Sequence, residues 1–247
     1  MRCGVTPNTL TLTGTAIMLA AGVCYAIGAG RPFGTRFDLC QPQGPYLLLA
    51  ACLLVLSSAC DMLDGAVARL GNLKSRFGAF LDSTLDRYSD FAVYAGIAVY
   101  YASSRPGNVT LCLLAMVAFM NSFMISYTRA RAEDLIEHCT VGYWQRGERS
   151  AAILIATFAH NVPALLVQQA ISPAFTVLRR MLHTHAVING RATIDDPRQG
   201  GWWLKVRLWR WPRHTWAYDV VTGLNIAFLI WARIPSIDPV GQWLGRS

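Results

Sequence analysis

Charged side chains are scarce in this sequence, since Asp, Glu, Lys and Arg make up 15% of its 247 residues, against about 25% in a typical soluble domain. Four long stretches contain none of these residues: 3–30, 39–60, 107–128 and 151–178. Each stretch reaches the roughly 20 residues that an α-helix needs to cross a bilayer core. A large soluble helical core would need polar faces, which these stretches lack. The sequence therefore predicts an integral membrane protein.

Paired cysteines are absent as well. The seven cysteines are scattered without a C-x-x-C motif, so neither a disulfide framework nor a zinc site is indicated. The opening stretch MRCGVTPNTLTLTG contains Pro7, Asn8 and four threonines, unlike the continuous apolar segment of a secretory signal. No cleavable signal peptide is therefore expected.

The apolar segments predict an all-α membrane protein with six transmembrane helices, near residues 9–29, 45–64, 88–105, 109–129, 150–171 and 216–234. No repeat or low-complexity segment interrupts the chain, so we expect one membrane domain over residues 1–247. Residues 172–215 are expected to form a basic insertion, in which GGWWLKVRLWRWPRHTW pairs basic residues with tryptophans. Such a segment is typical of an interfacial amphipathic anchor, and a nucleic-acid partner is not expected.

The positions of the basic residues predict the orientation in the membrane. Two groups lie in the loops after the second and fourth expected helices: Arg69, Lys74, Arg76 and Arg87, then Arg129, Arg131, Arg146 and Arg149. By the positive-inside rule these loops, and with them both termini, face the cytoplasm. The eight Lys and Arg residues of 179–213 then lie on the far side, because long connections follow the rule less strictly. The expected location is a prokaryotic cytoplasmic membrane.

Four aspartates gather in the stretch CDMLDGAVARLGNLKSRFGAFLDSTLDRYSD, residues 60–90. Asp61 and Asp64 are three residues apart, and Asp82 and Asp86 are four apart, so each pair shares one face of a helix. Carboxylates near a bilayer are costly unless they are paired, hydrated or bound to cations. Oxygen ligands without His or Cys suit Mg²⁺ or Mn²⁺. Two such ions would balance the four negative charges.

Small residues beside the acids leave space for a phosphorylated ligand: Gly65, Ala68, Gly78 and Ala79. Arg69 supplies a cation for phosphate oxygens. Small residues at this spacing also pack transmembrane helices whatever their function, and a single Asp could pair with an Arg. Neither alternative explains four acids on two helix faces. The stretch indicates phosphoryl chemistry on a pyrophosphate substrate.

The pattern DxxDGxxAR from Asp61 to Arg69, followed by GxxxDxxxD from Gly78 to Asp86, resembles the signature of the CDP-alcohol phosphotransferases, integral membrane enzymes of phospholipid synthesis. All eight signature positions match with the expected gaps, and the opening TPNTLTLTG is similar to the start of that family. The resemblance implies transfer of a substituted phosphate from a CDP-lipid to an alcohol, with release of CMP. It also implies a homodimer whose active site opens to the cytoplasm.

The resemblance further implies a role for each matching residue. The four aspartates would hold two Mg²⁺ ions, with Mn²⁺ as the alternative: Asp61, Asp64, Asp82 and Asp86. Of these, Asp64 and Asp82 would bridge the ions, and Asp86 would also be the general base for the attacking hydroxyl. The nucleotide of the CDP-lipid would be bound by a second set: Asn8, Gly65, Ala68, Arg69, Ser75 and Gly78.

A second group of residues is predicted to bind the phosphate of a soluble acceptor: Ser126, Arg129, Arg131, Arg146 and Arg149. Clustered arginines at a membrane surface bind anionic groups or anchor to lipid head groups. The run SYTRARAEDL at 126–135 resembles the branch of phosphatidylinositol phosphate and archaetidylinositol phosphate synthases. The element QRGER at 145–149 departs from that branch, because it lacks the first Glu and the usual Pro. Inositol phosphate is the expected acceptor, with the glycerol 3-phosphate of phosphatidylglycerophosphate synthases as the alternative.

Two other classes of membrane protein also use acidic residues within the membrane. Membrane prenyltransferases also bind Mg²⁺-pyrophosphate through Asp-rich motifs, but those motifs lie far apart in the sequence. A cation transporter would place its acids near the bilayer midplane on discontinuous helices. Here the acids flank a short basic loop, which favours the phosphotransferase.

Overall fold

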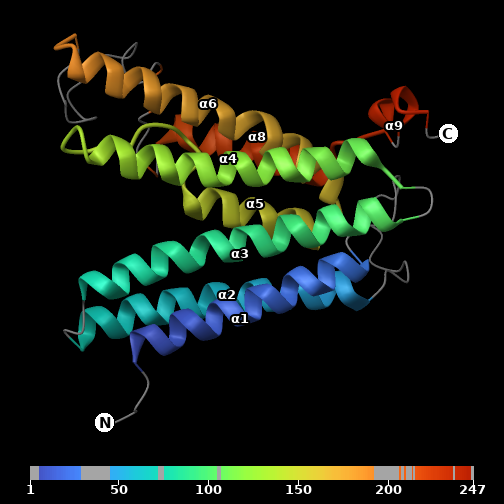
Figure 1. The fold of residues 1–247 in the computed structure, drawn as a ribbon, viewed down its shortest axis with the longest axis horizontal. Helices are drawn as coiled ribbons and strands as arrows, with labels where there is room; N and C mark the ends of the chain where they lie inside the picture. Colours follow the sequence, from blue (N-terminus) through green and yellow to red (C-terminus); the bar gives the residue numbers. More distant parts are fainter. Residues whose placement is uncertain are drawn as a thin grey trace. The chain divides into compact units, whose positions relative to one another are not determined.

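The computed structural model of the protein describes residues 6–28, 45–71, 75–104, 107–191, 206, 209, 213, 215–235 and 237–245. The helices of this part are α1 (Pro7–Gly28), α2 (Pro45–Leu70), α3 (Arg76–Ser103), α4 (Val109–Glu133), α5 (Arg146–Phe158), α6 (Val162–Ile188), α8 (Trp216–Trp231) and α9 (Pro239–Trp243) (Figure 1). No strand occurs in these ranges. The prediction of an all-α protein is confirmed.

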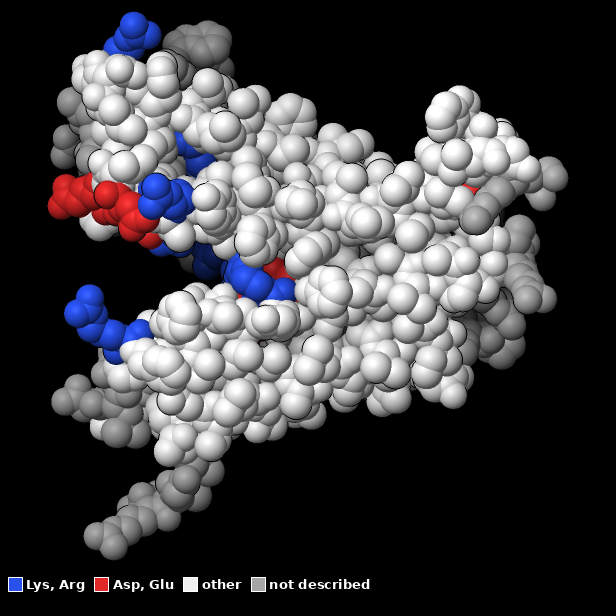
Figure 2. All heavy atoms as spheres, viewed as in Figure 1, with Lys and Arg blue, Asp and Glu red and all other residues white. Residues whose placement is uncertain are grey.

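Three helices, α1, α2 and α4, are long and apolar enough to cross a membrane. They coincide with the spans predicted at 9–29, 45–64 and 109–129. Helix α3 contains most of the predicted span at 88–105. The shorter apolar helix α8 contains most of the predicted span at 216–234. On the face shown in Figure 2, each part of the chain carries few charged side chains along most of its helices. The count of six spans stays a prediction.

The predicted helix at 150–171 is instead two helices, because α5 ends at Phe158 and α6 begins at Val162. Pro163 lies in the first turn of α6, where its missing N–H needs no partner; inside a continuous helix its ring would clash with the preceding turn. Asn161, between the helices, donates from its side chain to the carbonyls of Leu229 and Ala232, each at 2.9 Å. The prediction of one continuous helix at 150–171 was wrong, because Pro163 begins a new helix.

Helix α6 also extends further than the sequence indicated. It continues to Ile188, so the first part of the segment predicted as a basic insertion, 172–215, is a continuation of this helix. Most of the Trp-rich stretch within that segment, like Lys74, lies outside the described residues.

By its internal contacts the chain divides into two compact units, residues 1–116 with 235–247, and residues 117–234. In the first unit α1 packs against both α2 and α3. In the second unit α5 packs against α6 and α8, and α6 also contacts α8. The single membrane domain stays a prediction.

In the first unit, glycines allow the helices to approach closely. Ser57 of α2 donates its hydroxyl to the carbonyl of Gly14 in α1 at 2.9 Å. A Cβ atom on Gly96 of α3 would lie 2.0 Å from the carbonyl oxygen of Gly22 in α1, so the two backbones are in contact. This is the packing expected of membrane helices, where small residues let backbones meet.

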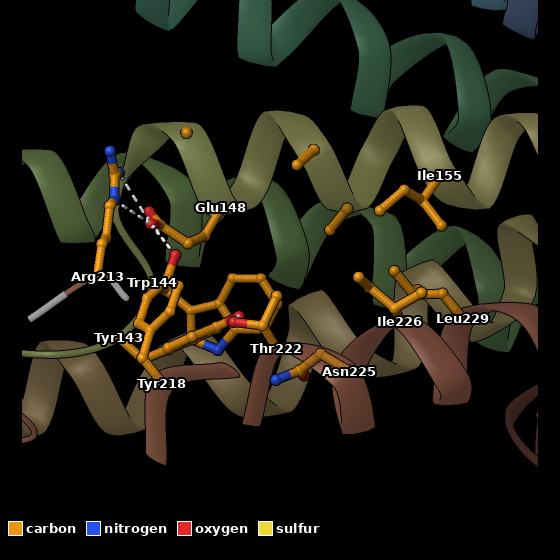
Figure 3. Close-up of a pocket in the computed structure, with 13 residues that line it drawn as sticks. Tyr143, Trp144, Glu148, Ile155, Arg213, Tyr218, Thr222, Asn225, Ile226 and Leu229 are labelled. Atoms are coloured by element: carbon orange, nitrogen blue, oxygen red, sulfur yellow. Dashed lines mark hydrogen bonds and ion pairs between the residues drawn. The ribbon is translucent and has the colours of Figure 1, made fainter. Parts of the chain in front are cut away.

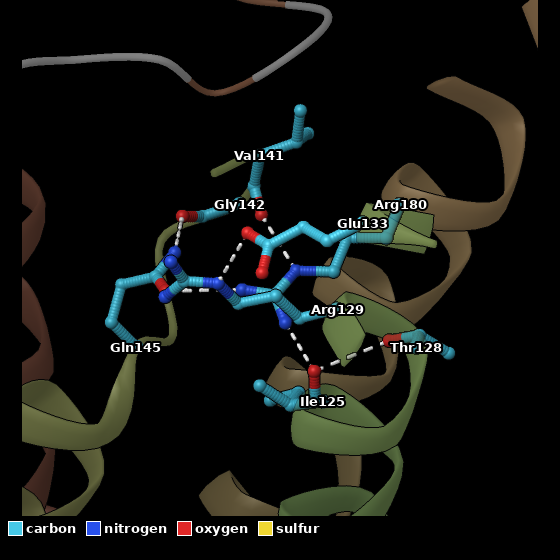
Figure 4. A network of polar contacts seen from close by, with 8 residues as sticks. All are labelled: Ile125, Thr128, Arg129, Glu133, Val141, Gly142, Gln145 and Arg180. Atoms are coloured by element: carbon cyan, nitrogen blue, oxygen red, sulfur yellow. Dashed lines mark hydrogen bonds and ion pairs between the residues drawn. The ribbon is translucent and has the colours of Figure 1, made fainter. Parts of the chain in front are cut away.

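In the second unit, a buried arginine connects three segments (Figure 4). Arg180 of α6 is 1% exposed, and its Nε and Nη2 donate to the carbonyl of Val141 and the side chain of Gln145, both at 3.0 Å. Its guanidinium also donates to the carbonyl of Ile125 in α4. Burial lowers the pKa of Arg180 to about 10, which leaves it charged at neutral pH. The residue thereby holds α4 and the loop before α5 against α6.

Candidate active site

The predicted acidic motif spans the end of α2 and the start of α3 in the first unit. Ser75 is the N-cap of α3, and its hydroxyl accepts a hydrogen bond from the backbone N–H of Gly78 at 2.9 Å. A capping Ser satisfies one of the free N–H groups at a helix start. Ser75 therefore determines where α3 begins, whatever contact it makes with a ligand.

The start of α1 meets these two helices at a hollow of about 230 Å³. Seven of the residues predicted for the site line it: Asn8, Asp64, Gly65, Ala68, Ser75, Gly78 and Asp82. Pro7, Thr11 and Ala79 complete the lining. The predicted residues Asp61, Arg69 and Asp86 are not among the lining residues. The structure thus brings residues from three helices to one hollow. The most distant of them, Pro7 and Asp82, are 75 positions apart in the sequence.

Thr11 is the residue of this hollow that the sequence analysis missed. It is 7% exposed, and its hydroxyl donates to Oδ2 of Asp64 at 2.8 Å. Asn8 lies one turn earlier, and its Oδ1 would be 3.2 Å from a Cβ placed on Gly78. The sequence did carry a signal for Thr11. It lies three residues after Asn8, which puts the two side chains on one helix face.

The lining chemistry fits a hard divalent cation. Asp64 and Asp82 bring carboxylates, Thr11 a hydroxyl and Asn8 an amide oxygen, and oxygen ligands are those that Mg²⁺ and Mn²⁺ prefer. Within the described residues, no three His, Cys, Asp or Glu side chains are gathered as a ready metal-binding cluster. The role of the four aspartates as metal ligands stays a prediction.

The other two aspartates have different surroundings. Asp86 is 8% exposed, and Nη2 of Arg87 lies 3.7 Å from its Oδ2. Asp61 lies at the contact of α2 with α1, where a Cβ on Gly14 would be 3.5 Å from its Oδ1. Asp86 is therefore the buried member of the set, whereas the other three are partly exposed.

The residues predicted to bind the acceptor lie in the second unit. Ser126, Arg129 and Arg131 belong to the last turns of α4, and Arg146 and Arg149 to the first turn of α5. The two α4 arginines are exposed and pair with acids of the adjoining turn: Arg129 with Glu133 at 2.9 Å and Arg131 with Asp134 at 3.0 Å. Arg149, in contrast, is 3% exposed. Binding of the acceptor by these residues stays a prediction.

A family model described as CDP-alcohol phosphatidyltransferase matches residues 4–188, which include the whole acidic motif and α1 to α6. The chain belongs to the CDP-alcohol phosphatidyltransferase family. It is therefore a membrane-bound transferase of phospholipid synthesis, as the motif predicted. Membership decides against the prenyltransferase and cation-transporter alternatives.

Two curated members of the family are similar over most of their length. The archaetidylinositol phosphate synthase of Methanothermobacter thermautotrophicus is 35% identical over 188 residues, which are 74% of this chain and 84% of that protein. The phosphatidylinositol phosphate synthase of Cutibacterium acnes is 34% identical over 198 residues, 74% of this chain and 86% of that protein.

Solved structures of the Mycobacterium tuberculosis phosphatidylinositol phosphate synthase share the fold. The structure with CDP-DAG bound has a TM-score of 0.63 and 30% identity, and covers 79% of this chain and 92% of that one. The structure in complex with manganese and citrate has a TM-score of 0.61 and 31% identity, covering 79% and 88%. In this family member the fold accommodates both a CDP-lipid and a divalent metal.

Proposed function

We propose that the protein transfers the lipid-linked phosphate of a CDP-lipid, such as CDP-diacylglycerol, to a hydroxyl of inositol phosphate and releases CMP. The observation that carries the proposal is the hollow at the start of α1, where seven of the predicted site residues, five of them from the acidic motif, meet. The relatives named as inositol phosphate lipid synthases favour this acceptor over glycerol 3-phosphate. The proposal includes a homodimer in a prokaryotic cytoplasmic membrane, with the site facing the cytoplasm.

The hollow would hold the nucleotide end of the donor. Gly65 and Ala68 leave the backbone of α2 accessible, and Arg69 follows on the same helix for the phosphate oxygens. A Cβ on Gly78 would lie 2.9 Å from the hydroxyl of Ser75 and 3.2 Å from the amide oxygen of Asn8. A larger residue at Gly78 would therefore close the hollow beside the two side chains expected to contact the nucleotide.

The four aspartates would hold two Mg²⁺ ions, or Mn²⁺ in their place: Asp61, Asp64, Asp82 and Asp86. When bound, such a pair of ions polarises a phosphate and offsets the charge on the departing CMP. The Thr11 hydroxyl, which donates to Oδ2 of Asp64, fixes the orientation of that carboxylate and leaves its other oxygen for the ion. Hydrogen bonds of this kind to metal ligands support both geometry and affinity.

Asp86 is the proposed general base. It would take the proton from the acceptor hydroxyl, whose oxygen then forms a bond to the β-phosphorus of the donor. The bond between that phosphorus and the oxygen of CMP breaks, and CMP leaves with the electron pair. The low exposure of Asp86 keeps bulk water away from the carboxylate.

The acceptor phosphate would be bound by Arg129, Arg131 and Arg149, assisted by Ser126 and Arg146. Arg149 is expected to contribute most, because a buried guanidinium attracts an anion more strongly than an exposed one. Arg129 and Arg131 already pair with Glu133 and Asp134, so the phosphate would contact the N–H groups that these acids leave free.

CMP release from CDP-diacylglycerol with Mg²⁺ tests the reaction, with inositol phosphate, glycerol 3-phosphate, inositol and serine as acceptors. Release is expected with inositol phosphate alone. Asp86→Asn should abolish it, whereas Asp90→Asn, one helical turn later on α3, should retain most activity. Release with glycerol 3-phosphate instead would overturn the acceptor, and full activity of Asp86→Asn would overturn the base.

The acceptor site is tested separately by Arg149→Ala. The KM for inositol phosphate should rise at least tenfold while kcat changes little, because one charge-assisted contact contributes about 1.5–3 kcal/mol. Arg149→Lys should recover part of the affinity, and Arg191→Ala, an exposed arginine after α6, serves as the matched control. An unchanged KM in Arg149→Ala removes this residue from the acceptor site.

A further inference from the structure

The second unit contains a cavity of about 390 Å³ between α5 and α8 (Figure 3). One end is polar and holds Glu148, Arg213 and Tyr218, whereas aliphatic side chains such as Ile155 and Ile226 line the other end. None of its lining residues belongs to the acidic motif or to the residues predicted to bind the acceptor. The cavity is therefore lined by residues to which the function proposed above assigns no role.

Glu148 carries an unsatisfied oxygen at the polar end. Its side chain is 7% exposed, and its Oε1 accepts from the hydroxyl of Tyr218 at 2.7 Å and from Nε and Nη2 of Arg213 at 3.2 and 2.9 Å. Its Oε2 is buried and has no hydrogen-bond partner in the described part of the chain. A buried acceptor without a donor costs about 1–3 kcal/mol, and more when it is charged. A ligand that donates a hydrogen bond to Oε2 would remove this cost.

Arg213 adds a site for an anion beside that acceptor. Its side chain is 62% exposed, so part of the guanidinium is accessible although it pairs with Glu148. The charge of Glu148 and their hydrogen bonds raise the pKa of Arg213, which keeps it cationic. Guanidinium groups bind phosphate through several N–H donors at once. The polar end thus offers an acceptor for a donor group and, next to it, a cation for a phosphate.

The aliphatic end completes the requirements for an amphiphile. Ile155, Ile226 and Leu229 extend along the cavity away from the charged residues, and burying an alkyl chain there contributes about 0.8 kcal/mol for each CH₂ group. Pockets with an apolar lining and a few convergent polar groups are the usual form of a small-molecule site.

We propose that this cavity binds a phospholipid whose head group combines a hydrogen-bond donor, an ammonium or a hydroxyl, with its phosphate. The donor would meet Oε2 of Glu148, the phosphate Arg213, and one alkyl chain the aliphatic end. Six of the thirteen lining residues follow residue 188, where the family match ends. The site is therefore formed jointly by the family fold and by the segment that follows it in this chain.

Three phospholipids with identical acyl chains test the proposal on the delipidated full-length protein in detergent. Phosphatidylethanolamine offers an ammonium and phosphatidylglycerol offers hydroxyls, whereas phosphatidylcholine has the phosphate and a cation but no donor in its head group. Bound lipid is counted by native mass spectrometry, and the shift in melting temperature is measured in parallel. We expect one molecule of a donor-bearing lipid to bind per chain and to raise the melting temperature of the protein. Equal retention of all three lipids, or of none, would overturn the proposal.

Two variants assign the binding to this cavity. Glu148→Gln keeps the size of the side chain but turns the free acceptor into an amide, and should weaken binding of the donor-bearing lipid at least tenfold. Ala151→Phe should fill part of the cavity one turn after Glu148 on α5 and also release the lipid. Ala102→Phe, an equally exposed alanine on α3, is the matched control and should bind as the wild type does. Wild-type affinity in both cavity variants would show that the lipid binds elsewhere.

Discussion

At the scale of single residues, one hydroxyl links α1 to the acidic motif. Thr11→Val removes the 2.8 Å hydrogen bond to Asp64 while preserving the shape of the side chain. A hydrogen bond to a charged group contributes about 1.5–3 kcal/mol, so kcat/KM should fall roughly ten- to hundredfold. Thr13→Val is the matched control, since the Thr13 hydroxyl is exposed and donates to the carbonyl of Thr9 on its own helix at 2.8 Å. CMP release at limiting Mg²⁺ measures both, and equal rates would contradict the role of Thr11.

A second single residue, Asp238, connects the start of α9 to the start of α4 within the first unit. The carboxylate of Asp238 accepts from the backbone N–H groups of Val109, Thr110 and Gly241 at 2.8, 2.9 and 3.0 Å. Burial by itself would raise the pKa of Asp238, but these bonds and the Thr110 hydroxyl outweigh it and lower the pKa to about 2, from an ordinary 3.8. A carboxylate with a lowered pKa stabilises the fold above its unfolded pKa and loses that effect as the pH falls towards the folded value.

This linkage predicts a pH dependence of stability. The melting temperature of the wild type should exceed that of Asp238→Ala by a constant amount at pH 5–7. The difference should shrink as the pH falls below about 4 and become small as the pH passes below the folded pKa of about 2. Asp219→Ala, in the first turn of α8, is the control for loss of a helix-terminal carboxylate. A difference that does not change with pH would contradict the low pKa of Asp238.

At the scale of helices, the contact of α1 with α3 depends on two glycines. Gly96→Ala would place a Cβ 2.0 Å from the carbonyl oxygen of Gly22, so the helices must separate, at a cost of about 1–3 kcal/mol. Gly223→Ala on α8 is the matched control, because in the described part of the chain no atom beyond the adjoining turns of α8 lies within 4 Å of its Cβ position. Alanine in a helix is favoured over glycine by about 0.5–1 kcal/mol, so this control should gain stability. Thermal unfolding in detergent should give shifts of opposite sign, and a stabilised Gly96→Ala would contradict the close contact.

At the scale of the whole molecule, the prediction concerns orientation in the membrane. Helix α3 separates Gly71 from Gly107, and the basic residues near Gly71 predict that it faces the cytoplasm. In a background without the seven native cysteines, Gly71→Cys should react with an impermeant maleimide only in inside-out vesicles. Gly107→Cys should react only in intact cells. Labelling of both from one side would contradict a membrane-spanning α3.

Much of the site could be predicted because its chemistry requires particular residue types at helical spacing. Asp64, Asp82, Gly78 and Asn8 were named from the sequence and line one hollow. The spans on α1, α2 and α4 followed from composition alone. The break before Pro163 was missed because the helix was placed from the apolar run alone, although the proline was the available signal.

The sequence by itself determined the membrane environment, the helical class and the family chemistry, since each depends on local composition and on short spacings. Only the tertiary structure decided which side chains meet across long separations. Glu148 and Arg213 are 65 positions apart, and Arg180 and Ile125 are 55 apart. Such pairs depend on how segments distant in the sequence pack together. For the same reason, the unsatisfied oxygen of Glu148 became visible only once α8 was placed against α5.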